Sequence, residues 1–253
     1  MSIIVHNLSF AFNKTGKTIF NNLSFETSCR SIAIVGPSGC GKSTLLRIIC
    51  GLIKKSSSNT LCGNISVNNI SPSQMIQTNS VGFMFQEDTL LPYLSVIDNI
   101  KLPLLLQKRA LTDVSQYVEK VGLSTDVDKY PRELSGGMRT RVALARTLIT
   151  HPAILLLDEP FTGLDEYWRN TLYRELETLR SEINPFTALV THHIEEALLL
   201  SNFIMVLGKN GNVLKEFSIS KKLPRVFNED PMDGLRGIQR EIQTLIIEDS
   251  NEK

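Results

Sequence analysis

The sequence predicts an α/β fold, in which strands and helices alternate and a long helical segment is inserted. The first observation is a short apolar run, Ser31–Val35, that leads through a glycine-rich loop into a segment with helical spacing. The second is that similar runs return far along the chain, at Ile154–Leu157 and Thr187–Thr191. The third is the helical pattern of residues 88–150, which is punctuated by prolines. Buried strands that alternate with helices are typical of α/β domains.

The chain starts with a small antiparallel β part. Ile3–Phe12 and Thr18–Glu26 have the composition of strands, and they flank the polar turn Asn13–Lys17. Ser31–Val35 is a continuous apolar run, which is typical of a strand buried on both faces. A helix is expected over Lys42–Cys50, where the apolar residues have helical spacing.

The rest of the chain continues the alternation. Residues 1–220 are expected to form one domain, with residues 88–150 as an inserted helical subdomain and residues 221–253 as a C-terminal tail that is amphipathic over Ile238–Ile247. The further expected strands are Asn64–Val67, Val81–Phe85, Phe203–Leu207 and Val213–Phe217, the last two as a hairpin, and the further expected helices are Glu166–Leu179 and Ile194–Leu200.

The composition excludes several classes of protein. The chain has 253 residues with 27 basic and 26 acidic side chains and a formal net charge of +1, so no nucleic-acid partner is expected. Its start lacks the features of a signal peptide, and no apolar run reaches the length of about 18 residues that a membrane span needs. The cysteines, Cys29, Cys40, Cys50 and Cys62, form no C-x-x-C pair. We therefore expect a reduced, cytoplasmic protein that reaches a membrane only through a protein partner.

A phosphate-binding loop follows the Ser31–Val35 strand. The motif G-x-x-x-x-G-K-[ST] is matched in full by Gly36, Pro37, Ser38, Gly39, Cys40, Gly41, Lys42 and Ser43, and Thr44 comes next. In this motif backbone N–H groups surround the phosphates of ATP, the lysine binds the β- and γ-oxygens, and the serine hydroxyl ligates Mg²⁺. A glycine-rich turn with an incidental Lys-Ser is the alternative, but the strand before and the helix after favour the phosphate loop. The predicted fold is therefore a P-loop NTPase (RecA-like) core with an antiparallel β subdomain and an inserted α-helical subdomain.

Two acids follow the apolar run Ile154–Leu157. In a P-loop fold, Asp158 at the end of this strand reaches Mg²⁺, and Glu159 polarises the attacking water as a general base. A solvated strand end is the alternative. Because a phosphate loop and further strands precede the pair, the metal and general-base roles are favoured.

The segment Leu134–Met138, with the sequence Leu-Ser-Gly-Gly-Met, indicates which family of P-loop proteins the chain resembles. Together with the loops above, it resembles the signature of ABC ATPases, and the resemblance covers residues 3–217. It implies that two such domains meet head to tail, with each ATP between one phosphate loop and the Ser135, Gly136 and Gly137 of the other domain. A helix N-cap is the local alternative for Ser-Gly-Gly.

Two polar positions after strands match the same family. Gln86 resembles the Q-loop glutamine, which would contact Mg²⁺ and the attacking water; an ordinary surface glutamine is the alternative. His192 resembles the switch histidine, which would bind the γ-phosphate and orient Glu159. The family usually has aspartate after this histidine, whereas His193 follows here.

Two more positions match the family less closely. Asp165, at the end of Thr162–Asp165, resembles the D-loop aspartate of the dimer interface, and it is also a good helix N-cap. Phe12 stands where the family usually stacks a tyrosine on adenine; it keeps the aromatic face and lacks the hydroxyl. A core or hairpin aromatic is the alternative for Phe12.

The sequence also resembles the nitrate, sulfonate and taurine import ATPases, through Leu90–Tyr93, Gly136–Arg139 and Leu223–Arg225, although Thr140, Val226 and Phe227 depart from that pattern. The resemblance implies an ATP-hydrolysing homodimer at the cytoplasmic face of the inner membrane. Its implied partners are integral membrane permease subunits and a solute-binding protein. Leu90, Leu91 and Tyr93 are expected to contact the permease, and packing within the helical part is the alternative.

Two other functions remain open from the residues. A soluble ABC ATPase of an assembly pathway, such as iron–sulfur cluster biogenesis, carries the same ATP-site motifs. A P-loop kinase that phosphorylates a small molecule leaves Leu134–Met138 without a role.

Overall fold

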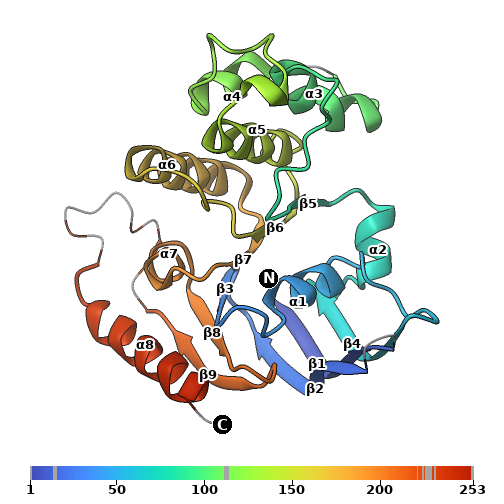
Figure 1. The fold of residues 1–253 in the computed structure, drawn as a ribbon, viewed down its shortest axis with the longest axis vertical. Helices are drawn as coiled ribbons and strands as arrows, with labels where there is room; N and C mark the ends of the chain where they lie inside the picture. The colour runs from blue at the N-terminus through green and yellow to red at the C-terminus, as the bar shows by residue number, and fades with distance from the viewer. Residues whose placement is uncertain are drawn as a thin grey trace. The chain divides into compact units, whose positions relative to one another are not determined.

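The structure, a computed structural model, describes residues 2–13, 16–110, 114–220, 222–223, 225, 230 and 232–251. The chain divides into two compact units (Figure 1). The first unit consists of Met1–Thr78 and Phe186–Lys253, and the second unit of Asn79–Pro185. The prediction of a helical subdomain over residues 88–150 and a tail over residues 221–253 stays a prediction.

An antiparallel sheet opens the first unit, with the strand order β2-β1-β4. Its strands are β1 (Ile3–Phe12), β2 (Lys17–Thr27) and β4 (Asn59–Val67). β4 starts five residues before the predicted Asn64, because Asn59 and the residues after it pair with the end of β1 despite their polar character. Backbone pairing therefore extends this strand beyond its apolar part.

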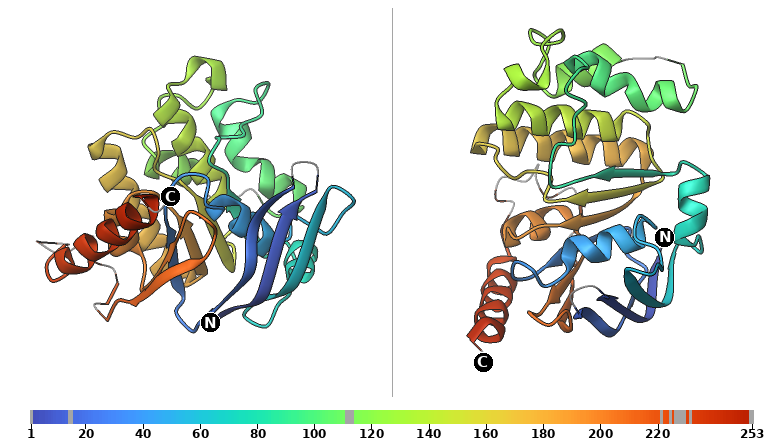
Figure 2. Two further views of the ribbon diagram at one scale, coloured as in Figure 1. Left: turned by 60° about the horizontal axis from the view of Figure 1, so that its bottom comes forward. Right: turned by 45° about the vertical axis from the view of Figure 1, so that its right-hand side comes forward.

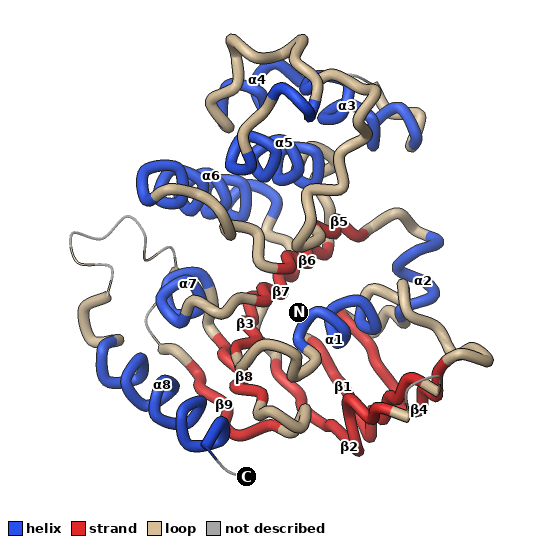
Figure 3. Tube along the Cα trace, viewed as in Figure 1, coloured by secondary structure: helices blue, strands red, loops and turns tan. Residues whose placement is uncertain are grey.

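A second group of strands lies in the first unit and is drawn in red in Figure 3. β3 (Ser31–Val35) lies between β7 (Phe186–Val190) and β8 (Phe203–Leu207), and both pairings are parallel. β9 (Val213–Ser218) adds to β8 as an antiparallel edge, which confirms the predicted hairpin. Every residue of β3, β7 and β8 is buried. This explains why their sequences are continuous apolar runs without alternation.

The first unit carries the helices α1 (Lys42–Ile49), α2 (Pro72–Gln77), α7 (Ile194–Leu200) and α8 (Arg236–Asn251). α2 was not predicted, although Ser71 and Gln74 form a capping box at its start. α8 lies along β9 and α7 (Figures 1 and 2).

The C-terminal segment is fixed to the first unit by polar contacts. Lys215 of β9 pairs with Glu241 of α8, and Gln239 of α8 donates a hydrogen bond to Glu195 of α7 at 3.1 Å. Arg225 is fully buried, and its Nη1 donates to the carbonyl oxygens of Leu198 (2.6 Å) and Ser201 (2.7 Å). Pro224, which belongs to the predicted importer motif of the tail, and Val226 and Phe227, which depart from that motif, lie outside the described residues.

The second unit is mainly helical. Its strands β5 (Val81–Met84) and β6 (Ile154–Asp158) pair in parallel. Its helices are α3 (Val96–Leu106), α4 (Val114–Lys120), the short 3₁₀ turn η1 (Pro131–Glu133), α5 (Gly136–Leu148) and α6 (Glu166–Ile183). No helix in the described part of either unit is long and apolar enough to cross a membrane.

Candidate functional site

The predicted phosphate loop connects β3 to α1 in the first unit. Gly41 is the N-cap residue of α1 and has a φ of 108°. A Cβ atom at this position would lie 2.6 Å from Cγ2 of Ile19 and 2.8 Å from Cζ of Phe20. Glycine is therefore required here both by the backbone conformation and by the close packing on β2. Ser43 and Thr44 lie in the first turn of α1 and are half-buried.

The lysine of the loop is folded over the loop itself. Lys42 is 6 % exposed, and its Nζ donates to the carbonyl oxygens of Gly36 and Pro37, both at 2.9 Å. α1 has no acidic residue in its first turn, so the positive end of the helix dipole is not offset there. Burial raises the pKa of the Cys40 thiol, so this cysteine stays neutral and adds no negative charge to the loop. These features together favour an anion at the loop.

A hollow of about 300 Å³ lies beside the phosphate loop. It is lined by Lys17, Thr18, Ile19, Gly39, Cys40, Lys209 and Asn210. Lys17 pairs across the strands with Phe12, which is 40 % exposed and packs edge-on against Phe10 at 4.9 Å between ring centroids. The first unit therefore brings Phe12 and the middle of the phosphate loop to the same part of the surface.

His192 follows the end of β7 in the first unit and is exposed. Its ring lies against that of His193, with 4.0 Å between the centroids. The turn around it is held by Thr191, whose hydroxyl donates to Glu196 at 2.5 Å and accepts from the His193 N–H at 3.0 Å. His193, which stands where the family usually has aspartate, thus packs on His192, the candidate switch histidine.

Asp158 and Glu159 stand at the end of β6 in the second unit. Asp158 is fully buried, and Glu159 has a φ of 50°, a left-handed conformation that is uncommon for residues other than glycine. The amide of Gln86 donates to Glu159 Oε2 at 3.4 Å, and the hydroxyl of Thr162 donates to the same oxygen at 3.3 Å. The strained backbone and the two donors fix the direction of this carboxylate, as is frequent at active sites. Thr162 was not predicted to support Glu159.

The Ser-Gly-Gly segment starts α5 in the second unit. The Ser135 hydroxyl accepts from the Met138 N–H at 3.2 Å, which is the N-cap arrangement, and Gly136 and Gly137 form the first turn. Asp165 is likewise the N-cap of α6, because it accepts from the Trp168 N–H at 2.9 Å. Both residues are therefore N-caps, which was the local alternative for Ser135 and one of the two roles considered for Asp165.

The predicted residues thus fall into two groups. The first unit holds the phosphate loop, Phe12 and His192, and the second unit holds Gln86, Asp158, Glu159 and the Ser135–Gly137 segment. Sequence reasoning missed Thr162, Lys17, Lys209 and Asn210. Thr162 follows Glu159 by three residues, which was the available signal, whereas the place of Lys209 depends on the pairing of β8 with β3.

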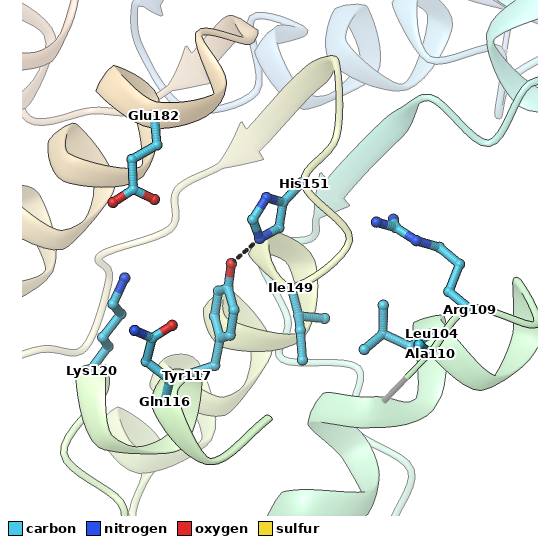
Figure 4. Close-up of a pocket in the computed structure, with 9 residues that line it drawn as sticks. All are labelled: Leu104, Arg109, Ala110, Gln116, Tyr117, Lys120, Ile149, His151 and Glu182. Carbon is cyan, nitrogen blue, oxygen red and sulfur yellow. Dashed lines mark hydrogen bonds between the residues drawn. The ribbon is translucent and has the colours of Figure 1, made fainter. Parts of the chain in front are cut away.

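Another hollow, of about 270 Å³, lies in the second unit and contains none of the predicted site residues (Figure 4). Tyr117 of α4 and His151 before β6 join across it through a hydrogen bond of 2.5 Å between the tyrosine oxygen and Nε2. It is lined by Leu104, Arg109, Ala110, Gln116, Tyr117, Lys120, Ile149, His151 and Glu182.

Comparisons with known proteins identify the family. The family model described as ABC transporter matches residues 20–162. The chain is 36 % identical to an aliphatic sulfonates import ATP-binding protein of Bacillus cereus over 241 residues, or 93 % of each chain. It is 39 % identical to a sulfate/thiosulfate import ATP-binding protein of Acinetobacter baylyi over 221 residues, which are 84 % of this chain and 61 % of that one.

A solved structure supports the same family assignment. A dimeric ATP-binding cassette in a post-hydrolysis state, bound to ADP and inorganic phosphate, superimposes with a TM-score of 0.76 and 28 % identity. The match covers 87 % of this chain and 100 % of that one. The fold of this chain is therefore that of an ATP-binding cassette. The chain belongs to the ABC transporter family, and it is an ATP-binding and ATP-hydrolysing cassette of that family.

Proposed function

We propose that this chain is the ATP-hydrolysing subunit of an importer and works at the cytoplasmic face of the membrane. The observation that carries the proposal is the similarity, over 93 % of both chains, to an aliphatic sulfonates import ATP-binding protein. By comparison, the chain matches 61 % of the length of the sulfate/thiosulfate import relative and 56 % of that of a maltose/maltodextrin import relative. Separate permease subunits form the transport path, and a solute-binding protein delivers the solute.

The phosphate loop binds the triphosphate of ATP in this proposal. The N–H groups between Gly36 and Ser43 wrap the phosphates, and the Lys42 ammonium exchanges its two carbonyl partners for phosphate oxygens. Phe12 is exposed enough to stack on adenine, and it lies opposite Lys17 at the edge of the hollow.

Hydrolysis depends on Glu159 as the general base for the attacking water. Gln86 and Thr162 hold its carboxylate, so the base is oriented before the substrate arrives. His192 binds the γ-phosphate through its exposed ring, and the tilted ring of His193, which lies against it, replaces the usual support by aspartate.

The donor set fits Mg²⁺, which prefers hard oxygen ligands. The Ser43 hydroxyl, the Asp158 carboxylate and the amide oxygen of Gln86 would hold the ion. The Gln86 amide nitrogen already donates to Glu159, so its oxygen is the atom left for a cation. When bound, Mg²⁺ neutralises charge on the β- and γ-phosphates.

Two copies of the chain form a head-to-tail dimer in the proposal, as a homodimer. The start of α5 presents the N–H groups of Gly136 and Gly137 to the γ-phosphate of the ATP held by the other copy. Ser135 keeps this helix start in shape through its N-cap bond. ATP therefore joins the two copies, and its hydrolysis separates them.

The permease docks on the segment Leu90–Tyr93. Buried Asn99 exchanges hydrogen bonds with the backbone of Leu91, at 2.9 and 3.2 Å, and so fixes the segment. Tyr93 is 70 % exposed on this fixed segment. An exposed aromatic on a rigid backbone is a suitable anchor for a partner protein.

Two experiments test the proposal. In the first, the tagged chain is purified from its native cells in mild detergent and its partners are identified by mass spectrometry. In the second, sulfonate uptake is measured in cells that lack the chain. Recovery of a multi-span permease and loss of alkanesulfonate uptake are expected. Recovery of soluble iron–sulfur assembly proteins alone, with normal uptake, would contradict the importer function. Loss of uptake of another solute would contradict only the sulfonate specificity.

A further inference from the structure

The hollow beside the phosphate loop has a wall that comes from the turn between β8 and β9. Gly208–Asn212 form this turn, in which the Gly208 N–H donates to the Asn212 carbonyl at 2.8 Å and the Gly211 N–H to the Gly208 carbonyl at 2.9 Å. Lys209 and Asn210 at its tip line the hollow together with Gly39 and Cys40 of the phosphate loop. Hence a cation far along the chain faces the middle of the loop.

The turn is tightly fixed against the strand beneath the phosphate loop. Gly211 has a φ of 72°, and a Cβ atom there would lie 2.0 Å from the carbonyl oxygen of Ile19. Ile19 is also the residue that leaves no room for a Cβ at Gly41. The turn and the loop therefore pack against the same residue of β2, which sets the position of Lys209 relative to Gly39 and Cys40.

The C-terminal helix holds the turn from its other side. Asp249 of α8 accepts a hydrogen bond from the backbone N–H of Lys209 at 2.6 Å. A Cβ atom at Gly208 would lie only 2.8 Å from the other carboxylate oxygen of Asp249. Position 208 therefore has no room for a side chain while Asp249 holds the turn. Asp249 is not among the residues that line the hollow, whereas Lys17 and Lys209 are. The lining itself is therefore cationic.

We propose that Lys209 binds the α-phosphate of the nucleotide and that Asp249 of α8 is a positioning residue for it. This inference rests on the proposed binding of ATP at the phosphate loop. Phe12 marks the adenine end, since it pairs with Lys17 at one edge of the hollow, and the phosphate loop marks the other end. The part of a nucleotide between adenine and the β-phosphate is the ribose and the α-phosphate, and the α-phosphate is the anion there. The C-terminal helix thereby contributes to nucleotide affinity.

The test measures the equilibrium binding of adenosine, ADP and ATP to the full chain. Lys209→Ala should weaken ADP and ATP binding by the same factor, ~2- to 5-fold for one exposed cation, and leave adenosine binding unchanged. The KM for ATP should rise equally while kcat stays the same, and Lys209→Arg should restore binding. Lys54→Ala, which removes an exposed lysine outside this hollow, is the matched control. Because the backbone bond to Asp249 survives in Lys209→Ala, the fold is retained.

Asp249 is tested by a pair of variants. Asp249→Ala removes the acceptor and should reproduce part of the loss of ADP affinity, whereas Asp249→Asn keeps an acceptor oxygen and should restore it. Unchanged ADP binding in Lys209→Ala would overturn the proposal, and so would a loss for ATP alone or an equal loss for adenosine. If the unmodified chain binds no nucleotide, the proposed function itself fails, which is a distinguishable result.

Discussion

Trp168, the only tryptophan of the chain, lies at a packed contact between α5 and α6 of the second unit. The Arg141 guanidinium of α5 stacks on its ring at 3.7 Å, and Nη1 of Arg141 donates to the Val121 carbonyl at 2.7 Å. Gly122 has a φ of 63°, and a Cβ atom there would lie 2.0 Å from Cη2 of Trp168. The change Gly122→Ala must therefore displace either the turn or the ring.

The expected decrease in the free energy of unfolding of Gly122→Ala has two parts. The left-handed backbone costs alanine about 1–2 kcal/mol, and forcing a methyl group into packed atoms costs about 1–3 kcal/mol more. Gly163→Ala is the matched control in the same unit, because Gly163 has a φ of 79° and no atom within 4 Å of the added Cβ. It should cost only the backbone part, so the two variants should differ by about 1–3 kcal/mol.

The assay is urea unfolding followed by the emission of Trp168, which reports on its own surroundings. Gly122→Ala should also change the emission of the folded protein, because a shift of either the turn or the ring changes the atoms that surround Trp168. ATP turnover should fall as well. The backbone N–H of Trp168 donates to Asp165, the N-cap of α6, so a shift of Trp168 also disturbs Asp165. Equal free energies of unfolding for the two variants, with unchanged emission, would refute the packing argument.

The remaining predictions concern docking, the cysteines and the phosphate loop. Tyr93→Asp should keep ATP binding, since Tyr93 lies on an exposed segment, but should weaken co-purification with the permease; undiminished co-purification would contradict the docking proposal. Burial raises the pKa of the Cys40 thiol, and that of Cys50 to about 11, whereas Cys62 is exposed. Because the thiolate is the reactive form, iodoacetamide at pH 8 should label Cys62 first, and labelling of Cys40 and Cys50 should increase only at higher pH. Mass spectrometry would show the order of labelling, and fast labelling of Cys40 would contradict its burial. Lys42→Ala should abolish ATP binding in equilibrium titrations, and ordinary affinity in this variant would contradict the role of the loop.

The parts of the molecule that could be predicted from sequence are those where one short segment determines both structure and chemistry. The phosphate loop is such a segment, because the strand, the glycines and the helix start are consecutive. The buried strands were also predictable, since a continuous apolar run needs cover on both faces. Likewise, Ser135 and Asp165 are residue types that favour N-caps, and both are N-caps in the structure.

The features that could not be predicted depend on contacts between distant segments. Lys209 lines the hollow only because β8 pairs with β3, and no local pattern shows that neighbourhood. The first residues of β4 are polar, and their pairing with β1 makes them a strand. α2 is different, because its capping box, Ser71 and Gln74, is a local pattern that the sequence itself contains.

The central claim is that Glu159 is the general base of an ATPase that closes as a dimer around ATP. The most direct measurement compares the unmodified chain with Glu159→Gln, by ATP turnover with Mg²⁺ and by light scattering with and without ATP. Glu159→Gln should lose turnover by about 10²- to 10⁴-fold, still bind ATP, and become dimeric when ATP is added. Turnover close to that of the unmodified chain, or a variant that stays monomeric with bound ATP, would contradict the account.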